Sequence, residues 1–253
     1  MIPSGIAYDS VQHEIYASSE YTTIVAVISD STNTVVKNIT MPEYPDSMTY
    51  DSSQNVIIVS EGNPYTGNVA VITNNYEIHT TISVGCVGSG PGSVVYDSVK
   101  NSVYVTNGSD VSIISDSNWK VSKVINNVGA AGSLVYDKTD GKIFGSNGQV
   151  ISDSANTAVA TLNVGSSPAG IAYDSGTSSI YVTNGNDPGS VTVSSISSGT
   201  PSTATPTPTG STSPTSTPTV PEFSIVALVS VLAAMMLVTL ALTMIVKKSK
   251  EQI

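Results

Sequence analysis

Few residues of this sequence have side chains that could carry acid–base or metal chemistry. The chain holds two histidines, His13 and His79, and one cysteine, Cys86. Histidine is the usual general base near neutral pH, and zinc sites combine His and Cys at short spacings. The two histidines stand at unrelated positions, and Cys86 has no His or Cys at metal-ligand spacing. We therefore assign no catalytic residue, and interpret the histidines as surface or sheet residues and Cys86 as a small buried hydrophobe.

The aspartates are more regular than the histidines, because five of them follow a tyrosine. The pairs are Tyr8-Asp9, Tyr50-Asp51, Tyr96-Asp97, Tyr136-Asp137 and Tyr173-Asp174, at spacings of 42, 46, 40 and 37 residues. An Asp that opens a chain reversal can accept hydrogen bonds from the backbone N–H groups that follow it. Recurrence at one position therefore favours turn chemistry over a cluster of catalytic carboxylates.

Each Tyr-Asp pair opens a unit with a fixed internal spacing. Eight residues after each tyrosine stands another large side chain: Tyr16, Ile58, Tyr104, Phe144 and Tyr181. A turn follows three residues later, as in Asn107-Gly108, Asn147-Gly148 and Asn184-Gly185, with Glu61-Gly62 and Ser19-Glu20 as degenerate versions. Asn-Gly between alternating apolar residues is a strong hairpin signal. We expect the eight tyrosines at these two repeat positions to pack in the core.

Short antiparallel strands repeated about every 40–45 residues are typical of the blades of a β-propeller. The fold class predicted is all-β, with about five four-stranded blades over residues 1–197. The expected blade bounds are 3–44, 45–90, 91–130, 131–167 and 168–197.

Two of the units carry a specific tetrapeptide, Tyr104-Val105-Thr106-Asn107 and Tyr181-Val182-Thr183-Asn184. These residues resemble the YVTN family of β-propeller repeats, which is known from archaeal surface-layer proteins. The resemblance covers about residues 3–197 and is looser in the other three units. It implies a propeller displayed outside the cell.

The pattern supplies 19 strands where a closed ring of five blades needs 20. The fifth unit stops after its third strand, Val191 to Ser194, and two residues alone, Met1 and Ile2, precede the first unit. The start of the chain also carries no signal peptide. We therefore expect the ring to be incomplete at its N-terminus, with an in-frame start upstream in the gene.

The composition changes abruptly after the repeats. Residues 198–221 contain nine Thr, five Ser and six Pro, a composition typical of O-glycosylated stalks, although a plain linker has the same signature. Residues 222–246 follow and are uncharged from Phe223 onward, long enough for a transmembrane helix. Residues 247–253 contain three lysines, which favours a cytoplasmic tail and places residues 1–222 outside the cell.

The start of the apolar segment, Pro221, Glu222 and Phe223, resembles the PEF-CTERM type of archaeal sorting signal. The order of this tripeptide, an apolar span and a lysine cluster carries the resemblance. It implies a partner, an archaeosortase-like processing enzyme that cleaves the tail. Retention of the uncut segment as a membrane anchor is the alternative.

The charge distribution excludes nucleic acid as a partner. Six lysines and eighteen acidic residues precede position 223, and the chain contains no arginine, whereas a phosphate backbone needs a basic face. No cofactor is predicted. An acidic, lysine-poor surface would favour cations, so bridging by Ca²⁺ is an open expectation.

Two aromatic residues break the polar pattern of one turn. Trp119 stands where the matching units have Asn33 and Asn156, and Tyr76 lies near the same turn of the preceding unit. A locally unexpected residue can mark function, so we expect Trp119 and Tyr76 to form an exposed contact patch, with packing on a neighbouring loop as the alternative.

Two sequons, at Asn38 and Asn107, are acceptors for glycosylation in an exported protein.

The sequence thus predicts a surface-layer or adhesive binding module, anchored in the membrane and displayed outside the cell, with cell-surface glycans or proteins as ligands. The alternative is an extracellular propeller enzyme of the lactonase or lyase type. Such enzymes gather carboxylates and a metal at the central mouth. Three or more convergent carboxylate or His side chains there would favour the enzyme, and small or hydroxyl residues would favour the binding module.

Overall fold

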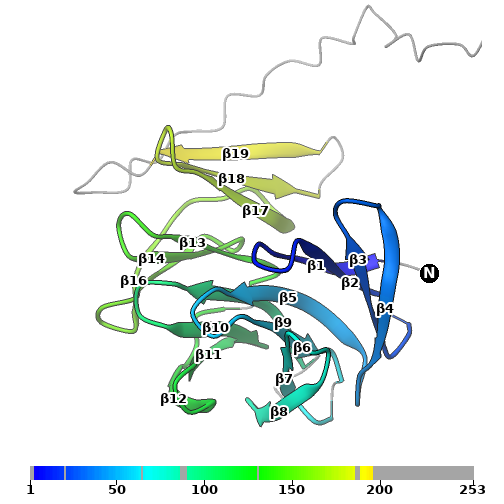
Figure 1. The fold of residues 1–253 in the computed structure, drawn as a ribbon. Helices are drawn as coiled ribbons and strands as arrows, with labels where there is room; N and C mark the ends of the chain where they lie inside the picture. Colours follow the sequence, from blue (N-terminus) through cyan, green and yellow to red (C-terminus); the bar gives the residue numbers. More distant parts are fainter. Residues whose placement is uncertain are drawn as a thin grey trace, which may run out of the picture. The chain divides into compact units, whose positions relative to one another are not determined.

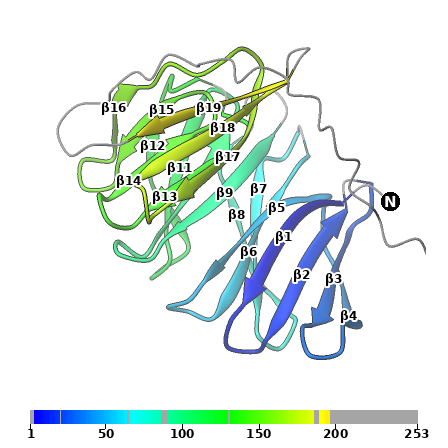
Figure 2. The ribbon, with the colours of Figure 1, turned by 90° about the horizontal axis from the view of Figure 1, so that it is seen from above.

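The computed structural model describes residues 3–19, 21–63, 65–85, 90–129, 131–185 and 189–195. These residues form nineteen strands in five antiparallel sheets, each made of strands that follow one another in the sequence. Each sheet is one blade, and the blades are numbered in chain order. Figures 1 and 2 show them following one another from the blue blade 1 to the yellow blade 5. The prediction of an all-β, five-bladed propeller is confirmed.

The strand bounds follow the repeat. Blade 1 holds β1 (Pro3–Asp9), β2 (Glu14–Ser19), β3 (Ile24–Ser29) and β4 (Thr34–Thr40). Blade 2 holds β5 (Pro45–Asp51), β6 (Val56–Glu61), β7 (Asn68–Thr73) and β8 (Ile78–Ser83). Blade 3 holds β9 (Pro91–Asp97), β10 (Ser102–Asn107), β11 (Asp110–Ser115) and β12 (Lys120–Ile125). Blade 4 holds β13 (Leu134–Asp137), β14 (Lys142–Gly145), β15 (Gln149–Ser152) and β16 (Thr157–Thr161). Blade 5 holds β17 (Pro168–Asp174), β18 (Ser179–Asn184) and β19 (Ser190–Ser195).

The repeated aspartates form the turn between the first two strands of each blade. The Oδ1 atom of Asp9 accepts hydrogen bonds from the backbone N–H groups of Val11 and Gln12, at 2.8 and 3.0 Å. Asp51, Asp97 and Asp137 make the same pair of bonds in their own blades. Each turn then passes through a residue with positive φ, namely His13, Asn55, Asn101, Gly141 and Ser178. The turn role predicted for the aspartates is confirmed.

Apolar side chains fill the space between consecutive blades. One buried cluster joins blades 1 and 2, a second joins blades 2 and 3, a third joins blades 3 and 4, and a fourth joins blades 4 and 5. Tyr16 lies in the first of these clusters, Tyr104 in the third and Phe144 in the fourth. Each of these side chains occupies the same repeat position and packs against the next blade.

The first strands of neighbouring blades approach closely. A β-carbon at Gly5 would collide with the backbone carbonyl of Asp46 in the next blade, so the approach of β1 to β5 requires glycine at this position. The Ser18 hydroxyl spans the same gap and donates to the Asp46 carbonyl oxygen at 2.8 Å. Ser60 repeats this bond by donating to the Gly92 carbonyl oxygen. These contacts fix the spacing of the inner strands.

Two tyrosines differ from the expectation that all eight repeat tyrosines pack in the core. Tyr181 is 37% exposed although Tyr104, at the same repeat position, is 0% exposed. Tyr8 is likewise exposed, whereas Tyr50 packs against the cluster between blades 1 and 2. The reason is position in the array, because Tyr8 faces away from blade 2 and Tyr181 faces away from blade 4.

The predicted stalk, membrane segment, sorting signal and basic tail lie outside the described residues, as does Cys86. Within the part of the chain that the structure describes, we find no helix of the length and apolarity needed to cross a membrane.

Tyr104→Ala should destabilise the propeller far more than Tyr181→Ala. The first change leaves a cavity between two blades and should lower the free energy of unfolding by about 3–5 kcal/mol. The second removes a side chain that already contacts water and should cost about 1 kcal/mol. Urea unfolding at low protein concentration measures both. Equal losses would contradict the assignment of Tyr181 to an uncovered face.

Candidate functional site: a pocket at the start of the inner strands

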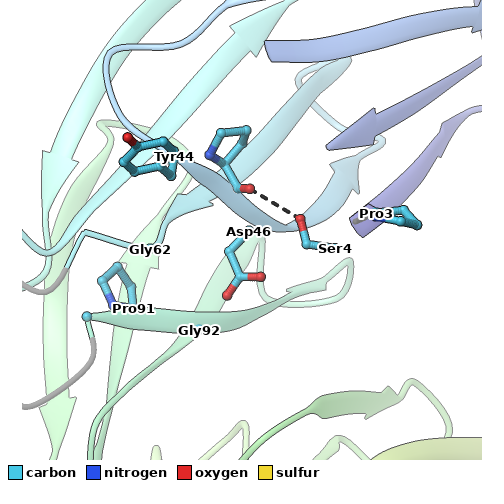
Figure 3. A pocket seen from close by; sticks show the side chains of 9 residues that line it. Pro3, Ser4, Tyr44, Asp46, Gly62, Pro91 and Gly92 are labelled. Atoms are coloured by element: carbon cyan, nitrogen blue, oxygen red, sulfur yellow. Dashed lines mark hydrogen bonds between the residues drawn. The ribbon is translucent and has the colours of Figure 1, made fainter. Parts of the chain in front are cut away.

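A pocket of about 370 Å³ lies where the inner strands of blades 1, 2 and 3 begin. Strands β1, β5 and β9 each start at a proline, and the segment that leaves β6 closes the pocket (Figure 3). The lining residues are Pro3, Ser4, Tyr44, Pro45, Asp46, Gly62, Gly90, Pro91 and Gly92. Proline is common at the first position of a strand, because its lack of a backbone N–H removes no hydrogen bond from the strand ladder there.

The pocket wall combines flat apolar rings with a few polar atoms. Tyr44 is half-exposed and shares the wall with the proline rings. The Ser4 hydroxyl donates to the Pro45 carbonyl oxygen at 3.3 Å and lies 2.9 Å from the Ser18 hydroxyl oxygen. Figure 3 shows the Asp46 carboxylate on the side of β5 that faces β9. A wall of this kind suits a ligand with both apolar faces and hydroxyl groups.

Among the described residues that line the pocket, Asp46 supplies the one carboxylate. Across the described ranges, no three His, Cys, Asp or Glu side chains are grouped so that they could hold a metal ion. The wall is otherwise made of proline, glycine, serine and tyrosine.

Glu61 lies beside the pocket, immediately before the lining residue Gly62. Its side chain is fully buried, and burial together with the nearby Glu43 carboxylate raises its pKa to about 7. A weaker contribution from the backbone of Glu43 acts in the opposite direction. Glu61 is therefore a carboxyl group that changes its charge near neutral pH.

The repeat explains why Glu61 is unusual. The same position holds Asn107 in blade 3 and Asn147 in blade 4, and their amide nitrogens donate to the Val84 and Val128 carbonyl oxygens at 2.8 and 3.1 Å. An ionised carboxylate cannot donate a hydrogen bond, whereas a protonated one can. Sequence reasoning treated Glu61-Gly62 as a degenerate turn. The signal that could have identified Glu61 was an acid in the place of a repeated asparagine.

Trp119 and Tyr76 occupy equivalent turns of blades 3 and 2, and both have positive φ, at 54° and 66°. Both are half-buried: Tyr76 packs against the cluster between blades 1 and 2, and Trp119 against the cluster between blades 2 and 3. The Tyr76 hydroxyl also donates to Glu14 Oε1 at 2.8 Å. Their part in ligand contact stays a prediction.

The two predicted glycosylation sites differ in their surroundings. Asn38 is exposed on β4, whereas the Asn107 side chain is buried and uses its amide nitrogen in the bond to Val84. A glycan on Asn107 would have to displace this bond, so Asn38 is the better acceptor. The histidines lie at the surface, with His13 Nδ1 3.5 Å from Asp30 Oδ2 and His79 exposed on β8.

Comparison with known proteins identifies the fold alone. No family model matches the sequence, and no curated protein matches it. Among solved structures, a chain of the Kuenenia stuttgartiensis hydrazine synthase is similar, with a TM-score of 0.62 and 14% sequence identity. The match covers 72% of this chain and 55% of that chain. That protein is named as an enzyme, but identity this low supports a shared propeller architecture and nothing finer.

Glu61→Gln should remove a pH dependence of stability. The folded pKa of about 7 lies above the ordinary 4.5, so the folded state binds more protons between these values and loses stability as pH rises through them. The loss should reach on the order of 3 kcal/mol above pH 7. Urea unfolding from pH 4.5 to 8 should show this decline in the native protein and a flatter profile in Glu61→Gln.

Glu77→Gln in the same blade is the matched control, because Glu77 is exposed. An unchanged pH profile in Glu61→Gln would show that another group causes the decline.

Proposed function

We propose that this protein is a surface-displayed binding module whose propeller holds a neutral glycan in the pocket between blades 1, 2 and 3. The observation that carries the proposal is the pocket lining, which combines Tyr44 and proline rings with the Ser4 hydroxyl and the Asp46 carboxylate. Sugars present apolar C–H faces that pack on aromatic rings, and hydroxyl groups that hydrogen-bond to carboxylates.

The charge of the protein supports a neutral ligand over an anionic one. Eighteen acidic residues and six lysines precede position 223, so the propeller repels acidic polymers. The lining residues that the structure describes include no lysine. A protein is the second class of ligand, and it would contact the same pocket wall through an extended segment of its chain.

The tail supports display at a cell surface. The Ser/Thr/Pro composition of residues 198–221, the apolar segment that begins at Phe223 and the lysines that follow form the order stalk, anchor and cytoplasmic tail. The YVTN-like tetrapeptides and the PEF-like tripeptide agree with a surface-layer protein of this kind. Many copies held at high density on a surface would gain avidity from a single modest pocket. The enzyme alternative would need more carboxylates than the one that Asp46 supplies.

Tyr44→Ala and Asp46→Asn test the pocket. Each should weaken glycan binding on an array of neutral oligosaccharides by about tenfold or more, because each removes a main contact of a small ligand. Tyr65→Ala is the control, since Tyr65 is highly exposed and is not part of the pocket lining. Undiminished binding in both pocket variants would place the ligand elsewhere, and binding of peptides alone would select the protein class.

The display proposal is tested by mass spectrometry of the protein recovered from cell membranes. Processing at the PEF-like signal predicts a mature chain that ends near Phe223 and lacks the peptide containing Lys250. An intact Lys250 peptide in the membrane fraction would show a retained anchor instead. Recovery of the protein from the cytosol alone would overturn surface display.

A further inference from the structure

A buried carboxyl group stands at the end of β6, next to the segment that closes the pocket. The Glu61 side chain is 0% exposed, and neither of its carboxyl oxygens has a hydrogen-bond partner among the described residues. Burial of an ionised carboxylate without donors is strongly unfavourable, whereas the neutral acid is tolerated. The charge of this one group therefore decides whether the chain around it can stay packed.

The surroundings of Glu61 offer its ionised form no compensating charge. Strand β6 packs against β1, β5, β7 and β9, and none of these strands contains a lysine or histidine. The acids at the far ends of the strands, which form turns there, are Asp9, Asp51 and Asp97. At the pocket end the acids are Asp46 and Glu43, and the Glu43 carboxylate adds to the effect of burial in raising the pKa of Glu61.

The repeat shows which interaction a side chain at this position makes. In blades 3 and 4 it is an asparagine whose amide donates to Val84 or Val128, the residue that follows the preceding blade's outer strand at this end. Met41 is the corresponding residue before blade 2, because its backbone N–H, like theirs, donates to the loop between the second and third strands of its own blade. A protonated Glu61 has one O–H that can take the place of the amide donor, whereas an ionised Glu61 has acceptors alone.

Two hydrogen bonds join the segment that follows Glu61 to the segment that precedes β5. The Gly62 backbone N–H donates to the Tyr44 carbonyl oxygen at 2.8 Å, and Asn63 Nδ2 donates to Glu43 Oε2 at 2.8 Å. Gly62 and Tyr44 both line the pocket (Figure 3). Any separation of these two segments therefore displaces the pocket wall.

We propose that Glu61 is a proton switch for the pocket, which keeps the wall closed while Glu61 is neutral and opens it when Glu61 ionises. Ionisation leaves two neighbouring carboxylates without a donor for Glu61, and water reaches Glu61 only if residues 61–63 move away from residues 43–45. That movement breaks the bond from Gly62 to Tyr44. A ligand of the pocket is then held at mildly acidic pH and released at mildly alkaline pH, a consequence that rests on the proposed function.

Amide hydrogen exchange at Gly62 tests the switch without a ligand, because opening breaks the bond that protects this N–H. The closed wall raises the pKa of Glu61 from 4.5 to about 7, so it binds the proton more tightly than an opened wall does. Protection is therefore complete below pH 4.5 and is lost as pH rises through 7. In the full chain in mild detergent, the protection factor of Gly62 should fall at least about tenfold between pH 4.5 and 8.

Gly185 is the matched amide in the same molecule. Its N–H donates to the Ser167 carbonyl oxygen at 2.9 Å, at the repeat position that Gly62 and Tyr44 occupy in blade 2. Gly185 follows Asn184, which does not titrate. The protection factor of Gly185 should stay constant over the same pH range, which separates local opening from unfolding of the whole propeller.

Two variants locate the proton. Glu61→Gln is neutral at every pH, so Gly62 should stay protected up to pH 8. Glu43→Gln keeps an oxygen that accepts from Asn63 but removes the neighbouring charge, so the loss of protection should be complete at a lower pH than in the native chain. Glu77→Gln is the control variant, because Glu77 is exposed, and it should leave the pH profile of Gly62 unchanged.

The ligand supplies a separate measurement. A neutral oligosaccharide that the native chain retains should bind at least about tenfold more weakly at pH 8 than at pH 5, and equally at both in Glu61→Gln. A native chain that binds no oligosaccharide, while Gly62 alone loses protection, would contradict the proposed function and support the switch. Constant protection at Gly62, or a loss that Gly185 or Glu61→Gln shares, would overturn the switch. Recovery of protection at pH 8 on addition of Ca²⁺ would assign Glu61 to a cation and overturn it as well.

Discussion

The structure depends on one constraint, which is that each blade has two apolar faces and a sheet can bury both only between two other sheets. Strand β7 shows the constraint in its simplest form. The consecutive residues Val69, Ala70, Val71 and Ile72 point alternately to the two faces, and all four are fully buried. Val69 and Val71 belong to the cluster toward blade 3, and Ala70 and Ile72 to the cluster toward blade 1. Neither face could be left to water without loss of core.

Packing of the blades also determines where the pocket forms. Packing of the apolar faces brings the first strands so close that a β-carbon at Gly5 would collide with the Asp46 carbonyl oxygen. The Ser18 hydroxyl donates a hydrogen bond to the same oxygen. At the start of these strands the chain enters and leaves each blade through segments that lie outside the strands. Tyr44 and Gly62 belong to such segments, and the pocket lies between them. The proposed binding site thus lies where the regular strand ladders end.

The repeat made the fold predictable from sequence, because the Tyr-Asp pairs and the large residue eight positions later are local and periodic signals. The pocket was not predictable, since Tyr44, Gly62 and Gly90 lie between the repeated positions and meet only in three dimensions. The exposure of Tyr8 and Tyr181 was missed for a different reason. A repeat pattern treats every blade as packed between two others. Among the described residues, blades 1 and 5 each pack against one blade. Glu61 was overlooked because the Glu61-Gly62 turn was identified from its glycine. The absence of the asparagine side chain that stands at this position in blades 3 and 4 was not used.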